Sequence, residues 1–142
     1  MPTRKASAIW EKGLKSGKGS FKGESGSVSG SYSFATRFGE EPGSNPEELL
    51  AAAEAACFSM ALALGLENNG TPSDSVETKA ACTVEKVGDG FKITTMTLDV
   101  TAKVPGIEDA RFQEIANATK DGCPVSQALK GNVNIKLNAK LG

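Results

Sequence analysis

One long apolar run constrains the fold more than any other feature of this 142-residue sequence. At its start, Asn45 suits the N-cap position and Pro46 the first helical position. Glu47 and Glu48 follow in the first turn, beside the positive end of the helix dipole. The apolar residues continue to about Glu67, where the sequence Glu-Asn-Asn-Gly is typical of a helix stop. The pattern predicts a helix of roughly 20 residues, about 30 Å long, apolar on nearly all sides and therefore central.

Strand-like segments lie on both sides of this run. Residues 5–35 are rich in Gly, Ser and Lys and predict short antiparallel strands, with turns near residues 15–19 and 23–26. Further along, residues 75–88 and 90–104 have the composition of two strands, and the glycines around Asp89 indicate a hairpin turn between them.

The C-terminal part predicts two helices and a last strand. Residues 107–122 are amphipathic at helical spacing, Pro124 suits the start of a short second helix, and residues 132–141 alternate as a strand. No repeat or low-complexity linker divides the chain. We therefore expect a single domain over residues 1–142 of the α+β class, with antiparallel β-sheets around a long buried central helix.

Composition excludes several classes of function. Sixteen basic and 17 acidic residues give a net charge of −1, which offers no basic surface for nucleic acid or anionic lipid. The apolar run is interrupted by Glu54 and Ser59 and reads as too short to span a bilayer, and the N-terminal residues have no signal-peptide core. We expect a cytoplasmic protein with neither a membrane nor a nucleic-acid partner.

Histidine is absent from the sequence. Its absence removes the Ser-His-Asp triad, the Cys-His dyad and the commonest metal ligand. The cysteines form no Cys-x-x-Cys pair, which argues against a structural metal site. Any reactive thiol must therefore be activated by another kind of group.

The three cysteines differ in their local surroundings. Cys82 shares a strand face with apolar neighbours and is predicted to pack in the hydrophobic core. Cys57 lies about three turns into the long helix, beyond the reach of the helix dipole, so the helix alone cannot make it a thiolate. Cys123 precedes Pro124 at a predicted N-cap, where free amide donors lower the pKa of a thiol. Local sequence thus favours Cys123 as the more acidic thiol and Cys57 as the more buried one.

Sequence spacing alone does not tell whether Cys57 and Cys123 meet. If they do, a pair of thiols without histidine suggests chemistry in which sulfur itself is oxidised. One thiolate attacks a peroxide to give a sulfenic acid, and the second thiol condenses with it to a disulfide. The thiolate needs a cation, and Arg37, oriented by a carboxylate, is a candidate.

The chain contains, in this order, the four segments TRFGEEPGSNPEELL, AAEAACFSMALAL, VPGI and GCPVSQAL. In order and spacing, these segments resemble the OsmC/Ohr family of peroxidases. The resemblance extends from Trp10 nearly to the C-terminus. It is to the osmotically inducible protein C (OsmC) branch, rather than to the organic hydroperoxide resistance (Ohr) proteins, mainly through CPVSQ and TRF.

This resemblance implies a thiol-dependent peroxidase of peroxiredoxin-like activity that reduces organic hydroperoxides, and hydrogen peroxide more weakly, in oxidative and osmotic stress defence. It implies an intertwined homodimer with active sites at the subunit interface. By position, Cys57 resembles the peroxidatic cysteine, Cys123 the resolving cysteine, Arg37 the activating arginine and Glu47 the carboxylate that holds it. No cofactor is implied beyond an external dithiol or a lipoylated protein as reductant. The local ranking of the two thiols is then reversed, because a nearby Arg37 can lower the pKa of Cys57.

Helix geometry bears on how such a site is assembled. Glu47 and Cys57 are ten residues apart, so in one helix they differ by about 15 Å in rise and roughly 80° in direction. We therefore expect Arg37 and Glu47 to reach Cys57 of the partner subunit, with each site built from two chains. Candidates for an apolar wall around the substrate are Phe38, Phe58 and Met60, which are also ordinary core residue types.

Besides the peroxidase, two other kinds of function stay open: a non-catalytic use of the cysteine pair and a purely structural role. The same pair of cysteines could serve as a redox switch, or in a ligand-binding dimer, without catalysis. A structural dimer with inert thiols is the third possibility, and it predicts that Cys57 reacts no faster than free cysteine.

Overall fold

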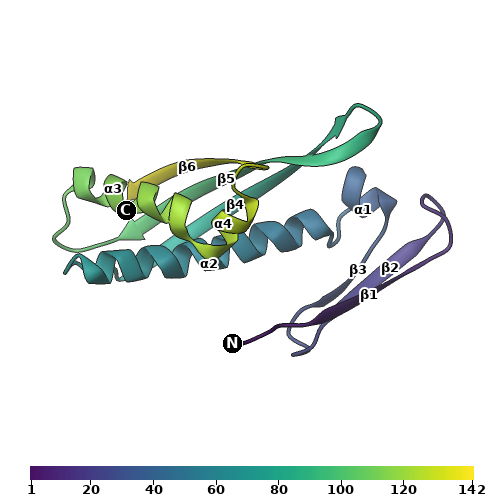
Figure 1. Cartoon of the computed structure of the whole chain (residues 1–142), viewed down its shortest axis with the longest axis horizontal. Helices are drawn as coiled ribbons and strands as arrows, with labels where there is room; N and C mark the ends of the chain where they lie inside the picture. Colours follow the sequence, from purple (N-terminus) through teal and green to yellow (C-terminus); the bar gives the residue numbers. More distant parts are fainter. The chain divides into compact units, whose positions relative to one another are not determined.

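The computed structural model describes residues 1–142, which divide into two compact units, Met1–Leu49 and Leu50–Gly142. Each unit contains one three-stranded sheet (Figure 1). Helices and strands are thus both present and partly segregated along the chain, which confirms the predicted α+β class. The expectation of a single domain over residues 1–142 stays a prediction.

The first unit is built on a small antiparallel sheet. Strands β1 (Ala6–Glu11), β2 (Lys18–Gly23) and β3 (Ser29–Tyr32) pair in that order, and the predicted strands and turns of this segment are confirmed.

A short helix, α1 (Phe34–Phe38), follows the third strand and was not predicted. It starts with a reciprocal cap: Ser33 Oγ accepts a hydrogen bond from the Thr36 N–H at 3.2 Å, and Thr36 Oγ1 accepts one from the Ser33 N–H at 2.8 Å. Arg37 therefore extends from a capped helical turn, which limits the directions in which its side chain can point.

The long helix α2 (Pro46–Asn68) has the predicted start and stop. Asn45 Oδ1 accepts a hydrogen bond from the Glu48 N–H at 2.8 Å, as expected for an N-cap. Gly70, with φ of +82°, lies just beyond the last turn in the left-handed conformation that glycine tolerates. The sequence signals for this helix are confirmed at both ends.

The second unit is organised around a mixed sheet. Strands β4 (Ser75–Val87) and β5 (Gly90–Lys103) form a long antiparallel hairpin, and β6 (Asn134–Leu141) pairs with β5 in parallel. The expectation of wholly antiparallel sheets is wrong at this last strand. Between β5 and β6 lie helices α3 (Asp109–Gly122) and α4 (Pro124–Leu129), and this crossover returns the chain to the end of the sheet at which a parallel strand must start.

The core of the second unit joins α2 and α3 to the inner face of this sheet. Its fully or nearly buried apolar side chains are Phe58, Leu62, Leu66, Met96, Leu98, Val100, Ala102, Phe112, Ile115, Ala116 and Val133. A Cβ atom at Gly65 would lie 2.9 Å from Ile115 Cγ2, so glycine allows α2 and α3 to approach closely there. Cys82 is partly buried against this core, in agreement with its predicted packing role.

Helix α2 is the long helix that the sequence predicts, but within the second unit only one of its faces is covered, so the expected burial is met on that face alone. On the opposite face, Met60 and Leu64 are 80% and 56% exposed. Helix α2 has 23 residues and contains an 18-residue window with a mean hydropathy of 1.9, so by length and composition alone it could cross a membrane. The apolar run is therefore long enough to span a bilayer, contrary to expectation, although the core helix of a soluble protein meets the same criterion.

Candidate active site

The sulfur atoms of Cys57 and Cys123 meet in the second unit. Cys57 lies on α2, Cys123 lies between α3 and α4, and their Sγ atoms are 3.1 Å apart as two free thiols. A disulfide bond is about 2.04 Å long, so bond formation needs an approach of about 1 Å. The condition set by sequence analysis for a redox couple, that these two cysteines meet, is therefore fulfilled.

Cys123 is fixed by two helix ends at once. Its N–H donates to Thr119 O at the end of α3, and its C=O accepts from the Gln127 N–H in α4, both at 2.9 Å. It is the N-cap of α4, with Pro124 in the first turn, as predicted. The thiol itself is 1% exposed, whereas Cys57 is half-buried. The expectation from local sequence that Cys57 is the more buried of the two is therefore wrong, and Cys57 is the more exposed cysteine.

The surroundings of Cys57 within its own chain do not favour a thiolate. Burial raises the pKa of the Cys57 thiol, and although the backbone N–H of Val125 acts in the opposite direction, Cys123 and the charge of Glu54 raise it further. A nucleophilic Cys57 therefore needs a cation in addition to these neighbours.

A buried carboxyl group completes the thiol cluster. Glu54, on α2 one turn before Cys57, is 0% exposed, and its Oε1 atom accepts hydrogen bonds from Ser126 Oγ at 2.6 Å and from Cys123 Sγ at 3.7 Å. Its second oxygen, Oε2, is buried without a hydrogen-bond partner. Sequence analysis noted Glu54 only as an interruption of the apolar run. The sequence feature that could have identified Glu54 is an acidic residue one turn from a cysteine inside an apolar helix. Such a charge is rarely buried without a partner.

In the first unit, Arg37 and Glu47 form the predicted pair. Arg37 Nε and Nη2 each lie 3.0 Å from Glu47 Oε1, and Nε lies 3.3 Å from Oε2. Glu47 is 5% exposed, so the carboxylate is buried while the guanidinium still reaches the surface. The guanidinium also lies over the ring of Phe38, 5.0 Å from its centroid, which favours the cation.

An aromatic hollow borders Arg37 in the same unit. Its lining residues are Trp10, Leu14, Tyr32, Ser33, Phe34, Arg37 and Phe38. Gly19 lies between the rings of Trp10 and Tyr32, each of which would be within 2.7 Å of a Cβ atom there. Glycine is therefore required for the pair of rings, whose centroids are 5.3 Å apart.

Of the three candidates for an apolar wall, only Phe38 lines this hollow. Phe58 is a fully buried core residue, and Met60 is exposed on the uncovered face of α2. The sequence did not predict that Trp10, Tyr32 and Phe34 form part of this hollow. Their rings come together only when the strands and α1 are folded.

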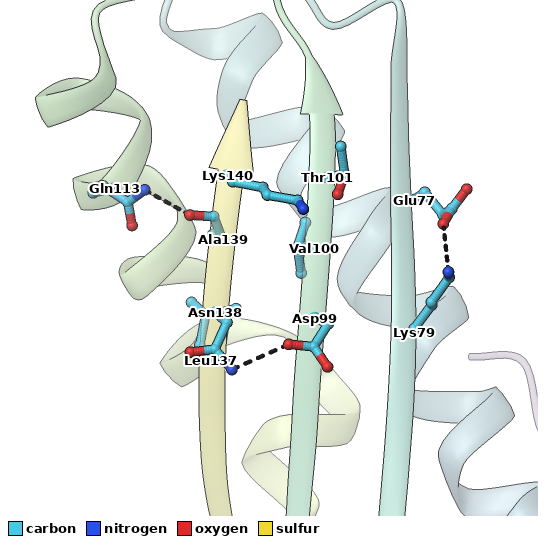
Figure 2. Close-up of a pocket in the computed structure, with 10 residues that line it drawn as sticks. All are labelled: Glu77, Lys79, Asp99, Val100, Thr101, Gln113, Leu137, Asn138, Ala139 and Lys140. Carbon is cyan, nitrogen blue, oxygen red and sulfur yellow. Dashed lines mark hydrogen bonds and ion pairs between the residues drawn. The ribbon is translucent and has the colours of Figure 1, made fainter. Parts of the chain in front are cut away.

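A second hollow lies on the outer face of the sheet of strands β4, β5 and β6 (Figure 2). It contains ion pairs and hydrogen bonds between side chains, including Glu77 with Lys79 at 3.7 Å and Asn138 with Asp99 at 3.1 Å. Beside it, Gln113 Nε2 from α3 donates to Ala139 O on β6 at 2.8 Å. Its charged side chains, Glu77, Lys79, Asp99 and Lys140, are exposed, as on a solvated sheet surface, and no cysteine lines it.

Comparison with known proteins decides the family. The family described as "OsmC-like protein" matches residues 39–138, a span that includes Glu47, Cys57 and Cys123. The chain belongs to the OsmC-like family.

Within this family the chain is similar over nearly its whole length to Peroxiredoxin OsmC of Escherichia coli, at 45% identity over 138 residues, covering 96% of each chain. Its similarity to Organic hydroperoxide resistance protein OhrB of Bacillus subtilis is 38% over 101 residues, covering 70% of this chain and 72% of that protein. The crystal structure of OhrB from Bacillus subtilis has a TM-score of 0.74 and covers 96% of this chain and 98% of that chain, with 30% identity. The higher identity over a longer span agrees with the predicted OsmC branch.

Proposed function

We propose that this OsmC-like protein is a two-cysteine peroxidase that reduces organic hydroperoxides to alcohols. The observation that carries the proposal is the contact between the two thiols, 3.1 Å apart, with one sulfur half-buried and the other buried. The names of the two relatives, a peroxiredoxin and an organic hydroperoxide resistance protein, support the same reaction class.

In the proposed cycle, the Cys57 thiolate attacks the distal oxygen of the hydroperoxide. The O–O bond breaks, the alkoxide takes a proton and leaves as the alcohol, and Cys57 becomes a sulfenic acid. Cys123 then forms a disulfide with Cys57 and water is released. An external dithiol reduces the disulfide by exchange, so no bound cofactor is needed.

The role proposed for Arg37 is to favour the Cys57 thiolate and to stabilise negative charge on the leaving oxygen. Because the neighbours of Cys57 in the second unit raise the pKa of its thiol, a cation is the missing element. We propose that it comes from the partner subunit of a homodimer, held in place by Glu47 of the same chain as Arg37. The uncovered apolar face of α2 supports such a dimer, because isolated chains seldom expose large apolar side chains together.

The substrate's organic group is proposed to occupy the aromatic hollow beside Arg37. Its rings, from Trp10, Tyr32, Phe34 and Phe38, are suited to an alkyl or aryl hydroperoxide, which gains more from apolar contact than hydrogen peroxide does.

The proposal is tested by consumption of cumene hydroperoxide with excess dithiothreitol, beside Cys57→Ser and Cys123→Ser. We expect both variants to lose turnover and only Cys123→Ser to reduce one equivalent of peroxide. A single stoichiometric oxidation of the wild-type protein, without turnover on any dithiol, would favour the redox switch. A Cys57 that reacts no faster than free cysteine would instead indicate inert thiols.

A further inference from the structure

Glu54 is the one buried charged side chain beside the two thiols that the proposed cycle does not use. It lies on α2 one turn before Cys57, is fully buried, and has one oxygen, Oε2, without a hydrogen-bond partner. Burying a charged carboxylate with an unsatisfied oxygen is costly, so its presence in the middle of a core helix calls for a compensating role.

The contacts of Glu54 lead to the buried thiol. Cys123 Sγ lies 3.7 Å from Glu54 Oε1 and 3.1 Å from Cys57 Sγ, and its single S–H hydrogen can be donated to either atom. Cys123 therefore faces both a proton acceptor and its reaction partner. Ser126 Oγ donates to the same Oε1 atom at 2.6 Å, which fixes the carboxylate against the first turns of α4. A thiol must lose its proton to act as a nucleophile, and Cys123 is too buried to release that proton to bulk water.

We propose that Glu54 is the proton acceptor for Cys123 when the two cysteines condense, and that it returns the proton to the oxygen leaving Cys57. This inference rests on the proposed peroxidase cycle and adds a catalytic residue to its second step.

The step balances in atoms and electrons. Cys57 enters as a sulfenic acid and Cys123 as a thiol, whose proton passes to Glu54. The Cys123 sulfur forms the S–S bond, the S–O bond of Cys57 breaks, and the departing hydroxyl takes the proton from Glu54 and leaves as water. The Cys123 sulfur is oxidised, the Cys57 sulfur is reduced, and the carboxylate is restored.

The last turn of α3, just before Cys123, contains Lys120 and Asp121. Helix α2 contributes Cys57 to the thiol cluster besides Glu54, and α4 contains no ionisable side chain. From α3, Arg111 and Glu114 line a surface hollow together with Cys123, and they form an ion pair with each other at 2.8 Å.

The test compares Glu54→Gln with Glu67→Gln, the same chemical change at an exposed position of the same helix. Each protein receives one equivalent of cumene hydroperoxide, and sulfenic acid and disulfide are followed over time by dimedone trapping and mass spectrometry. We expect Glu54→Gln to form the sulfenic acid at least as fast as the wild-type protein, because the charge of Glu54 raises the pKa of the Cys57 thiol. Conversion to disulfide should be slower by at least about tenfold, in the range typical of general acid-base catalysis. Glu67→Gln should match the wild-type protein in both steps.

A pH profile separates proton transfer from a structural role. In Glu54→Gln the condensation rate should rise steeply with pH, because Cys123 must then ionise unaided, and it should approach the wild-type rate in alkali. Ser126→Ala removes a hydrogen bond but keeps the carboxylate, so the shape of its profile should follow the wild-type protein.

Wild-type condensation kinetics in Glu54→Gln would overturn the inference. So would an equal slowing of Glu54→Gln and Ser126→Ala with no recovery at high pH, since both would then act only by positioning. If wild-type Cys57 is not oxidised by the hydroperoxide at all, the proposed function fails, and this step fails with it.

Discussion

Arg37 and Glu47 form a pair in which the buried partner fixes the direction of the exposed one. Nε and Nη2 of the guanidinium both lie 3.0 Å from Glu47 Oε1, and the carboxylate is almost inaccessible to solvent. A charge-assisted pair of this geometry limits the rotation of a long side chain. Arg37 is therefore held in one orientation before any substrate arrives.

Removing the charge of Glu47 should slow the first chemical step. A hydrogen bond to a charged group contributes about 1.5–3 kcal/mol, so Glu47→Gln should lower the rate of Cys57 oxidation by about tenfold or more. The measurement is the second-order rate constant with one equivalent of cumene hydroperoxide. Glu48→Gln, the same change at the exposed neighbouring position, is the control. If Glu47→Gln and Glu48→Gln changed the rate constant of Cys57 oxidation equally, Glu47 would have no specific role in that step.

Removing Arg37 should reveal the raised pKa of the Cys57 thiol. A raised pKa leaves less thiolate at neutral pH, and the thiolate is the reactive form. In Arg37→Ala, alkylation of Cys57 by iodoacetamide should be slower than that of free cysteine at about pH 7 and should still rise beyond about pH 9. Peptide mapping by mass spectrometry distinguishes Cys57 from Cys82 and Cys123. A plateau below about pH 8 would mean that another group already stabilises the thiolate.

Mixed dimers test whether the site is assembled from two chains. Arg37→Ala keeps the nucleophile, and Cys57→Ser keeps the cation, so each homodimer should be inactive. If Arg37 acts across the interface, heterodimers contain one complete site, and an equal mixture refolded together should recover about a quarter of wild-type activity. Recovery should be absent from a mixture of homodimers kept from exchanging subunits. An inactive refolded mixture with proven heterodimers would place Arg37 and Cys57 in the same chain.

The uncovered face of α2 should be the dimer contact. Burying side chains such as Met60 and Leu64 stabilises an interface by about 1.5–3 kcal/mol each. The double change Met60→Lys with Leu64→Lys should therefore give monomers in sedimentation equilibrium. Glu67→Lys, which alters charge at an exposed position of the same helix, should leave the association state unchanged. An unchanged dimer in the double variant would exclude this face.

Substitution of Phe58 should mainly lower stability, whereas substitution of Phe38 should mainly change substrate preference. Phe58 is fully buried in the core, so Phe58→Ala should lower the free energy of unfolding by about 3–5 kcal/mol, measured by urea denaturation. Phe38→Ala should instead reduce the preference for cumene hydroperoxide over hydrogen peroxide, with a smaller loss of stability. The reverse pattern would remove the aromatic hollow from the proposed substrate site.

Much of the fold was predictable because its signals are local. The N-cap of α2 at Asn45, its stop near Gly70 and the start of α4 at Pro124 each depend on a few adjacent residues. The parallel pairing of β6 was not predictable in this way, because it depends on where the crossover through α3 and α4 returns the chain. The capped turn of α1 was missed because its cap at Ser33 pairs with a threonine rather than the usual glutamate or glutamine.

The site was predictable only in part. The resemblance of short segments pointed to Cys57, Cys123, Arg37 and Glu47, but the contact between the thiols is a property of the folded chain. Glu54 was overlooked because a single acidic residue in an apolar run reads as an interruption. Only its full burial against Ser126 and Cys123 gives it significance.

The unequal exposure of Cys57 and Cys123 affects which sulfur of a disulfide between them a reductant would attack. In the proposed disulfide, Cys57 would be the more accessible sulfur to an incoming thiol, since Cys123 is only 1% exposed between two helix ends. The mixed disulfide then forms on Cys57, and Cys123 is the leaving group. In the proposed cycle, regeneration would therefore have a fixed regiochemistry, and a reductant would need to recognise only the surface around Cys57.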